Sequence, residues 1–106
     1  MNTKSNILLH QITRRIRSVE SGARVILYGS YARGEEKKDS DIDLLIIINK
    51  KKISFQDKKR ISFPLYDPEF DTGQIISPII LSLSDWNDRH RITPFYENIH
   101  KEGIEL

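Results

Sequence analysis

The chain of 106 residues has the size of one small domain, and 17 Lys and Arg residues against 15 Asp and Glu residues give it a net charge of +2. This balance is too mild to indicate a nucleic-acid-binding protein by itself, and the absence of cysteine excludes disulfides and thiolate metal sites. No apolar stretch approaches the ~20 residues that span a bilayer, and the N-terminus lacks the apolar core of a secretory signal. We therefore expect one domain over residues 1–106, in the cytoplasm and without a membrane partner.

The hydrophobic periodicity predicts helices and strands in alternation. Apolar residues spaced by three and four indicate an amphipathic first helix, with Ser5 as its N-cap and Gly22 as its stop. Pro78 lies inside the last strand, where its missing N–H favours an edge strand or a bulge. The predicted segments are helix 4–20, strand 24–28, a helical turn at 30–33, a charged loop at 35–39, strand 42–49, a weak helix 54–65, an irregular connection around Pro64 and Pro68, strand 74–83, a short helix capped by Ser84, and a last helix from Thr93-Pro94 to Gly103.

This order, α-β-α-β-α-β-α, predicts an α/β or α+β domain with a small sheet. The run over residues 42–49 is almost continuously apolar and branched, which is typical of a central strand buried on both faces. The pattern leaves the order and direction of the strands open.

Residues 29–43 contain the most informative segment for function. Gly29 and Ser30 follow a short apolar strand, and a strand-to-helix turn without a Cβ can bring backbone N–H groups against a phosphate. An ordinary tight turn with a capping serine would explain the same pair. Asp41 and Asp43 stand two residues apart at the start of the next strand, so strand alternation places both side chains on one face.

Two like charges on one face repel each other unless a cation lies between them. Mg²⁺ takes oxygen ligands from one or two carboxylates together with substrate phosphates, so Asp41 and Asp43 predict a divalent metal site. The alternative is a turn at Ser40-Asp41, with Asp43 facing solvent at the mouth of the strand.

Together, the runs GSYARG at residues 29–34 and SDIDLL at residues 40–45 resemble the signature of the minimal nucleotidyltransferases, in the DNA polymerase beta-like nucleotidyltransferase superfamily. The resemblance implies a nucleotidyltransferase fold with a small mixed sheet flanked by helices. It also implies that Asp41 and Asp43 are catalytic residues that hold Mg²⁺ at the phosphates of a nucleoside triphosphate.

In the same family pattern, Gly29 and Ser30 would bind the outgoing phosphates of that nucleotide. Arg33 lies one helical turn past Ser30 and could reach a phosphate, although an arginine at such a place is often a surface ion-pair partner.

The family pattern has a third carboxylate on the next core strand, where it acts as a base or an extra metal ligand. Residues 74–81 contain no acid, and Ser77 falls near the expected position. Asp71 completes the predicted catalytic set if the strand begins earlier, and Glu69 and Asp67 also lie just upstream.

The chain resembles the nucleotidyltransferase antitoxins that accompany helical HEPN-type ribonuclease toxins. The resemblance implies a Mg²⁺-dependent enzyme that transfers AMP from ATP to a tyrosine hydroxyl of such a toxin, a substrate that brings its own docking surface. One alternative is a catalytically reduced binding module that neutralises its partner by occlusion. Another is a transferase for a small hydroxylated molecule such as an aminoglycoside, which needs a second domain or a homo-oligomer to build the acceptor pocket. Nucleic-acid polymerisation is not expected at a net charge of +2.

Overall fold

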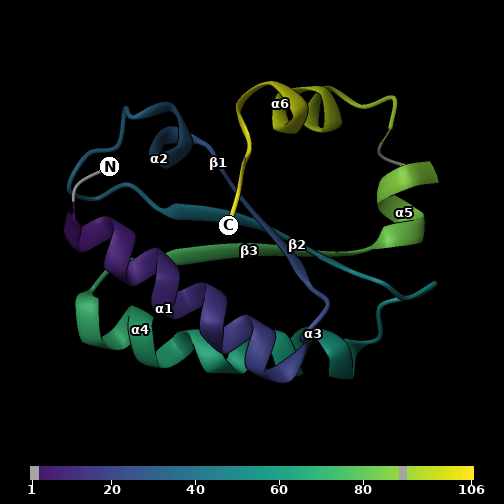
Figure 1. Ribbon diagram of the computed structural model, residues 1–106, viewed down its shortest axis with the longest axis horizontal. Coiled ribbons are helices and arrows are strands. Elements are labelled where there is room, and N and C mark those ends of the chain that lie inside the picture. The colour runs from purple at the N-terminus through teal and green to yellow at the C-terminus, as the bar shows by residue number, and fades with distance from the viewer. Residues whose placement is uncertain (1–2, 89–90) are drawn as a thin grey trace.

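The computed structural model describes residues 3–88 and 91–106, and Figure 1 shows a small sheet with helices above and below it. The elements are α1 (Thr3–Val19), β1 (Arg24–Tyr28), α2 (Ser30–Arg33), β2 (Ile42–Ile48), α3 (Phe55–Ser62), the 3₁₀ helix η1 (Phe63–Leu65), α4 (Tyr66–Thr72), β3 (Ile76–Ser82), α5 (Leu83–Asp88), α6 (Pro94–Glu102) and β4 (Ile104–Glu105).

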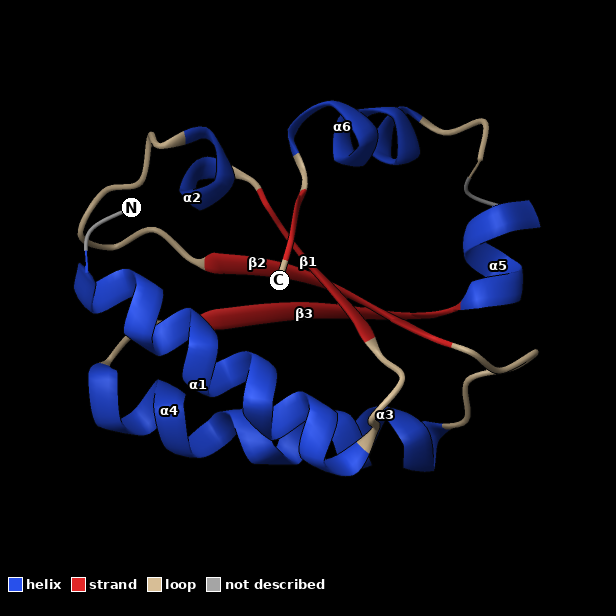
Figure 2. Cartoon of the chain, viewed as in Figure 1, coloured by secondary structure: helices blue, strands red, loops and turns tan. Residues whose placement is uncertain are grey.

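The strands lie in the order β3-β2-β1-β4, and their directions are mixed. β2 and β3 run parallel because α3, η1 and α4 form the crossover between them, whereas β1 runs antiparallel to both β2 and β4. Figure 2 shows the C-terminal strand returning to the sheet after α6. The predicted α/β fold with a small mixed sheet is confirmed. The sequence pattern did not indicate β4, which has two residues.

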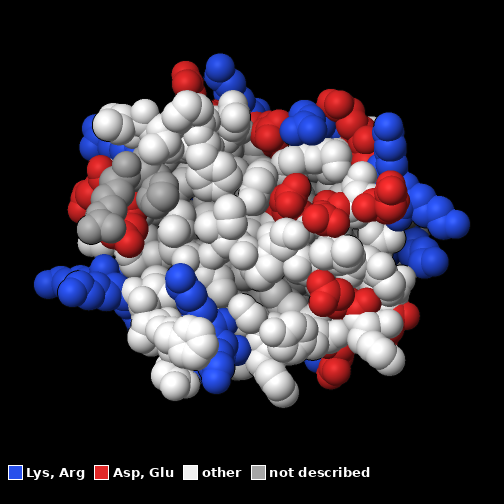
Figure 3. All heavy atoms as spheres, turned by 180° about the vertical axis from the view of Figure 1, so that it is seen from behind, with Lys and Arg blue, Asp and Glu red and all other residues white. Residues whose placement is uncertain are grey.

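Acidic and basic side chains are interspersed on the surface. Figure 3, the view from behind, shows both signs of charge on the same face and no dominant basic field. Within residues 3–88 and 91–106, no helix combines the length and the apolar character needed to cross a bilayer.

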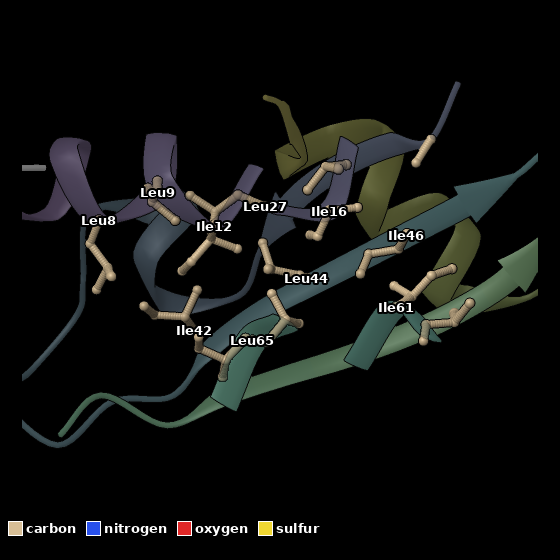
Figure 4. Packing of buried hydrophobic residues seen from close by; sticks show 14 of the residues in the cluster. Leu8, Leu9, Ile12, Ile16, Leu27, Ile42, Leu44, Ile46, Ile61 and Leu65 are labelled. Carbon is tan, nitrogen blue, oxygen red and sulfur yellow. The ribbon is translucent and has the colours of Figure 1, made fainter. Parts of the chain in front are cut away.

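The core lies on both faces of β2, whose side chains alternate between two helical layers. On one face, called here the α1 face, Leu44 packs in a cluster with Ile12 of α1 and Ile61 of α3 (Figure 4). On the opposite face, called the α6 face, Leu45 packs in a second cluster with Trp86 of α5 and with residues of α6. The prediction that this strand is central and buried on both faces is therefore confirmed.

The predicted irregular connection around Pro64 and Pro68 is wrong, because this stretch is helical in η1 and α4. Both prolines lie in first turns, where the N–H that proline lacks has no partner within the helix. Two predicted caps also differ. Ser5 lies inside α1, which begins at Thr3, and Ser82 rather than Ser84 accepts the N–H of Asp85 at the start of α5, at 3.0 Å.

β3 is an edge strand, as Pro78 predicted. The backbone N–H of Ile76, the first residue of β3, donates to the carboxylate of Glu69 at 2.8 Å. Pro78 has no N–H to offer two residues later. A side-chain cap and a proline therefore occupy the first part of this edge.

Asp57 stabilises the start of the crossover between β2 and β3. Its carboxylate accepts hydrogen bonds from Lys50 Nζ at 2.7 Å, from the backbone N–H of Ser54 at 3.0 Å and from Arg60 at 3.2 Å, while Ser54 Oγ accepts the N–H of Asp57. The hydrogen bond from Lys50, followed by those from Ser54 and Arg60, holds the pKa of Asp57 well below its usual range. The ionised carboxylate is therefore part of the folded state.

Replacement of Asp57 by asparagine is expected to lower the Tm at pH 7. A carboxylate with a depressed pKa in the folded state contributes stability above its unfolded pKa, and this contribution is lost as the pH falls through the folded value. The difference between the two proteins should therefore narrow below about pH 4. Thermal unfolding followed by circular dichroism at pH 7 and pH 3 measures it. Asp39→Asn, in an exposed loop, is the control, and a constant difference at both pH values would contradict the assignment.

Candidate active site

Three strands contribute to one row of side chains at the mouth of the sheet. Tyr28 of β1 is directly opposite Asp43 of β2, and Asp43 is in register with Ser77 of β3. Residues paired across neighbouring strands project to the same face, so the three side chains lie together. Because Asp43 precedes Leu45 by two residues, this face is the α6 face.

Asp41 lies next to this row. Ser77 Oγ donates to Asp41 Oδ2 at 3.4 Å. Burial raises the pKa of Asp43, the negative charge of Asp41 raises it further, and the guanidinium of Arg33 opposes the rise. The charge of Asp41 acts on Asp43, so the two carboxylates lie near each other, although Asp41 precedes β2 and is not placed by strand alternation. Asp43 is the more enclosed of the two.

Gly29 makes room for the carboxylate of Asp43. Its backbone has φ 75° and ψ −156°, a conformation that residues with a Cβ rarely adopt. A Cβ at this position would collide with Asp43 Oδ2. The sequence predicted a glycine that brings backbone N–H groups against a phosphate, and the neighbour that the structure shows at Gly29 is the carboxylate of Asp43.

The turn at Gly29 leads directly into α2. Ser30 is the first residue of this helix, and the N–H of Arg33 donates to the carbonyl of Gly29 at 3.1 Å. Gly34 ends the helix with φ 69°. A helix start leaves its first backbone N–H groups without partners inside the helix, and Ser30 adds a hydroxyl directly after Gly29, the residue that lies against Asp43.

Arg33 connects this turn to α6. Its guanidinium donates to Glu35 at 3.2 Å and to Glu102 of α6 at 3.1 Å. Its positive charge also lowers the pKa of Asp43, so the guanidinium lies within electrostatic reach of the carboxylates. The ion pairs agree with the surface role that the sequence left open.

The structure does not bring Asp71 to the two aspartates. Asp71 lies in α4 and lines a surface pocket of about 420 Å³ with Arg14 and Arg15 of α1. The side chains of Glu69 and Asp67 are also engaged elsewhere, Glu69 at the backbone of Ile76 and Asp67 with Arg15 at 3.7 Å.

Asp71 stays away from the two aspartates because α4 extends to Thr72 and β3 begins only at Ile76. Ser77 therefore lies beside Asp41 and Asp43 at the place where the family pattern has its third carboxylate, as its sequence position indicated. We call this place the third corner of the site. In the part of the chain that the structure describes, no three acidic, His or Cys side chains gather into a metal-binding group.

Tyr28 belongs to the site and was not predicted. Burial and the charge of Asp43 raise the pKa of Tyr28 to about 12, so its hydroxyl keeps its proton at neutral pH. Its ring packs edge-on against Phe95 of α6, with centroids 5.3 Å apart. In the sequence, Tyr28 could be noticed only because it directly precedes Gly29. Its place opposite Asp43 follows from the antiparallel pairing of β1 with β2, which the sequence pattern left open.

The donor set fits a divalent cation. Two neighbouring carboxylates supply oxygen ligands of the kind that Mg²⁺ prefers, with coordination positions left for phosphate oxygens and water. Burial raises the pKa of Asp43 most, and the negative charge of Asp41 raises it further, so a cation between the two carboxylates would relieve part of this cost. The hydroxyl of Ser77 is a weaker third donor than a carboxylate.

Comparisons with known proteins agree with this geometry. Residues 9–100 match the family model described as "Nucleotidyltransferase domain". A protein of Methanocaldococcus jannaschii named "Putative protein adenylyltransferase MJ0141" is 33% identical over 84 residues, which cover 78% of this chain and 77% of that protein.

Two solved structures share the fold. The crystal structure of a toxin–antitoxin with AMP-PNP matches with a TM-score of 0.65 and 13% identity, over 91% of this chain and 69% of the other. A "putative nucleotidyltransferase" from Sulfolobus solfataricus matches with a TM-score of 0.62 and 20% identity, over 93% and 76% of the two chains. The family match and the archaeal relative support the expectation of an enzyme. With its paired aspartates beside a glycine-serine turn, the chain belongs to the nucleotidyltransferase domain family.

Proposed function

We propose that this protein transfers AMP from ATP, with Mg²⁺, to a tyrosine hydroxyl of a HEPN-type toxin in the cytoplasm and thereby acts as its antitoxin. The observation that carries the proposal is the juxtaposition of Asp41 and Asp43 with the turn at Gly29-Ser30. Support comes from the relative named as a protein adenylyltransferase and from the fold shared with a toxin–antitoxin bound to AMP-PNP.

In this mechanism the chain binds and orients the triphosphate. Asp41 and Asp43 would hold the metal ion, which supplies neutralisation of charge on the reacting phosphate. The backbone and hydroxyl of Ser30 bind phosphate oxygens, and Gly29 leaves the space that keeps Asp43 in place. Arg33 adds positive charge on the side of α6.

The chemical step is an in-line displacement. The acceptor hydroxyl forms a bond to the α-phosphorus of ATP, the bond to the β-phosphate oxygen breaks, and pyrophosphate leaves. The proton of the acceptor passes to water, because Ser77 offers a hydroxyl and no carboxylate at the third corner. Transfer should therefore be slow for an enzyme of this type.

Ser77 also favours a second candidate function. A site with two carboxylates and one hydroxyl can bind nucleotide weakly, and such a protein can neutralise its partner by covering it. The two functions differ in one respect: occlusion does not require Asp41 and Asp43.

Transfer of label from α-phosphate-labelled ATP to a HEPN toxin distinguishes them. We expect Mg²⁺-dependent labelling of a toxin tyrosine, identified by mass spectrometry, and its loss by at least about 100-fold in Asp41→Ala/Asp43→Ala. Asp39→Ala removes an exposed carboxylate two residues before Asp41 and is the matched control. Equal labelling by the double variant would refute the site. Unchanged neutralisation of the toxin without labelling would establish occlusion.

A further inference from the structure

The outer face of the crossover helices carries a stripe of exposed aromatic side chains. Phe55, Phe63, Tyr66 and Phe70 expose 69%, 74%, 59% and 89% of their surface. Large apolar side chains gathered on one exposed face are unusual in a monomeric soluble protein and mark interaction surfaces. We call this set, together with Lys59, the aromatic stripe.

The stripe follows helical spacing over α3, η1 and α4. These three elements follow one another without a gap and form one nearly continuous helical segment, called here the rod (Figure 1). Its members are Phe55, Lys59, Phe63, Tyr66 and Phe70, separated by four, four, three and four residues. This spacing places them on one side of a helix and is the spacing that packs against another helix. The opposite side of the same rod is the buried one, formed by Asp57, Ile61, Leu65 and Pro68.

The stripe lies on the opposite side of the sheet from the active site. Ile61 and Leu65, on the inner side of the rod, pack into the cluster on the α1 face. Asp43 and Ser77 project from the α6 face. A protein that places an acceptor hydroxyl at Asp43 therefore approaches from the other side, and the stripe is left for a different partner.

The order of residues in the stripe is symmetric about a point between residues 62 and 63. If a second copy runs antiparallel, Phe55 of one copy lies opposite Phe70 of the other, and Lys59 lies opposite Tyr66. The two Phe63 rings then meet near the twofold axis. Two copies of one chain can satisfy each other in this way because an interface between identical subunits must be self-complementary.

Contacts within one chain prepare this pairing. Lys59 Nζ already lies 5.0 Å from the centroid of the Phe55 ring, and Phe63 and Tyr66 pack edge-on with centroids 6.0 Å apart. Lys59 would contact its own Phe55 and the Tyr66 ring of the second copy at once, so a cation–π contact forms across the interface. Each aromatic side chain can bury about 150–250 Å², and four on each copy reach the ~1,000 Å² that a specific interface needs.

We propose that the protein forms an antiparallel homodimer through the aromatic stripe, with two active sites facing outward. The dimer does not depend on transfer activity. Light scattering coupled to size exclusion should give twice the mass of one chain. Lys59→Glu should weaken the dimer at least about 30-fold by replacing the cation over the rings with an anion. Ile92→Glu changes an isoleucine that is 92% exposed and lies outside the aromatic stripe, so it should leave the dimer intact.

A pair of compensating substitutions tests the contact of Lys59 with Tyr66 of the second copy. Tyr66→Lys alone places two lysines opposite each other and should also weaken the dimer, whereas Lys59→Glu with Tyr66→Lys should restore it. Positions 59 and 66 are about 10 Å apart along one helix, so restoration reports a contact between copies. Circular dichroism shows that each variant is folded. A wild-type monomer, or a double variant weaker than both single ones, would overturn the proposal.

Cross-linking tests the twofold axis independently, since the chain has no cysteine of its own. Phe63→Cys should form a disulfide between copies on oxidation because position 63 lies next to the axis. Phe55→Cys is the matched control: its two copies would lie about 22 Å apart, so it should stay uncross-linked unless it is mixed with Phe70→Cys. Equal cross-linking of the two single variants, or none at 63, would contradict the geometry.

Discussion

Gly29→Ala is expected to lower the free energy of unfolding by about 2–4 kcal/mol. Two effects act together. The backbone at Gly29 has φ 75°, which costs a residue with a Cβ about 1–3 kcal/mol, and the added Cβ meets the carboxylate of Asp43. Urea denaturation measures the loss. Because Asp43 must move, the proposed Mg²⁺-dependent binding of ATP should be weakened as well if that proposal is correct.

Two other glycines separate the effects. Gly34 has φ 69° but open space around it, so Gly34→Ala should show the backbone cost alone, about 1–2 kcal/mol. Gly22 has open space and no positive φ, so Gly22→Ala should be close to neutral. If Gly29→Ala cost no more than Gly34→Ala, the contact with Asp43 would not constrain this turn.

Ser77→Asp is expected to lower the Tm without divalent cation and to strengthen the response to Mg²⁺. A third carboxylate beside Asp41 and Asp43 adds repulsion, so the Tm without divalent cation should fall. Mg²⁺ should then raise the Tm of this variant by more than it raises that of the wild type. If the proposed transfer reaction is correct, its rate should increase by about 10-fold or more, because a positioned base contributes ~10²–10⁴-fold.

Ser77→Asn has the shape of the aspartate without the charge and is the matched control. It should gain neither Mg²⁺-dependent stability nor transfer rate. The readings with Mg²⁺ alone test the geometry of the third corner, and the readings with ATP and acceptor test the reaction. Indistinguishable responses to Mg²⁺ in the two variants would show that the side chain at position 77 does not share a cation with Asp41 and Asp43.

Part of this site could be predicted from short-range sequence patterns alone. The two-residue spacing of Asp41 and Asp43 at the start of an apolar run indicated two neighbouring carboxylates, although β2 begins only at Ile42, and Pro78 restricts its strand to an edge. Neither inference needs knowledge of distant segments. For the same reason, the Gly29-Ser30 turn could be recognised before its neighbours were known.

The parts that were missed depend on tertiary structure. Asp71 could join the site only if the third strand began early, and the length of α4 decides that start. Tyr28 lies beside Asp43 only because β1 pairs antiparallel with β2. The aromatic stripe was hidden in a segment predicted as a weak helix and an irregular connection, since its spacing emerges only when α3, η1 and α4 form one rod.

The blocked start of β3 has a consequence for how acceptors are recognised. An open sheet edge lets an extended peptide bind as an additional strand through backbone hydrogen bonds. Here Glu69 already takes the N–H of Ile76, and Pro78 has none to give, so the edge nearest Ser77 offers a peptide little backbone pairing. If the proposed transfer to a tyrosine is correct, recognition should then depend on the shape and side chains of a folded surface, and an unfolded polypeptide carrying the same tyrosine should be a poor substrate.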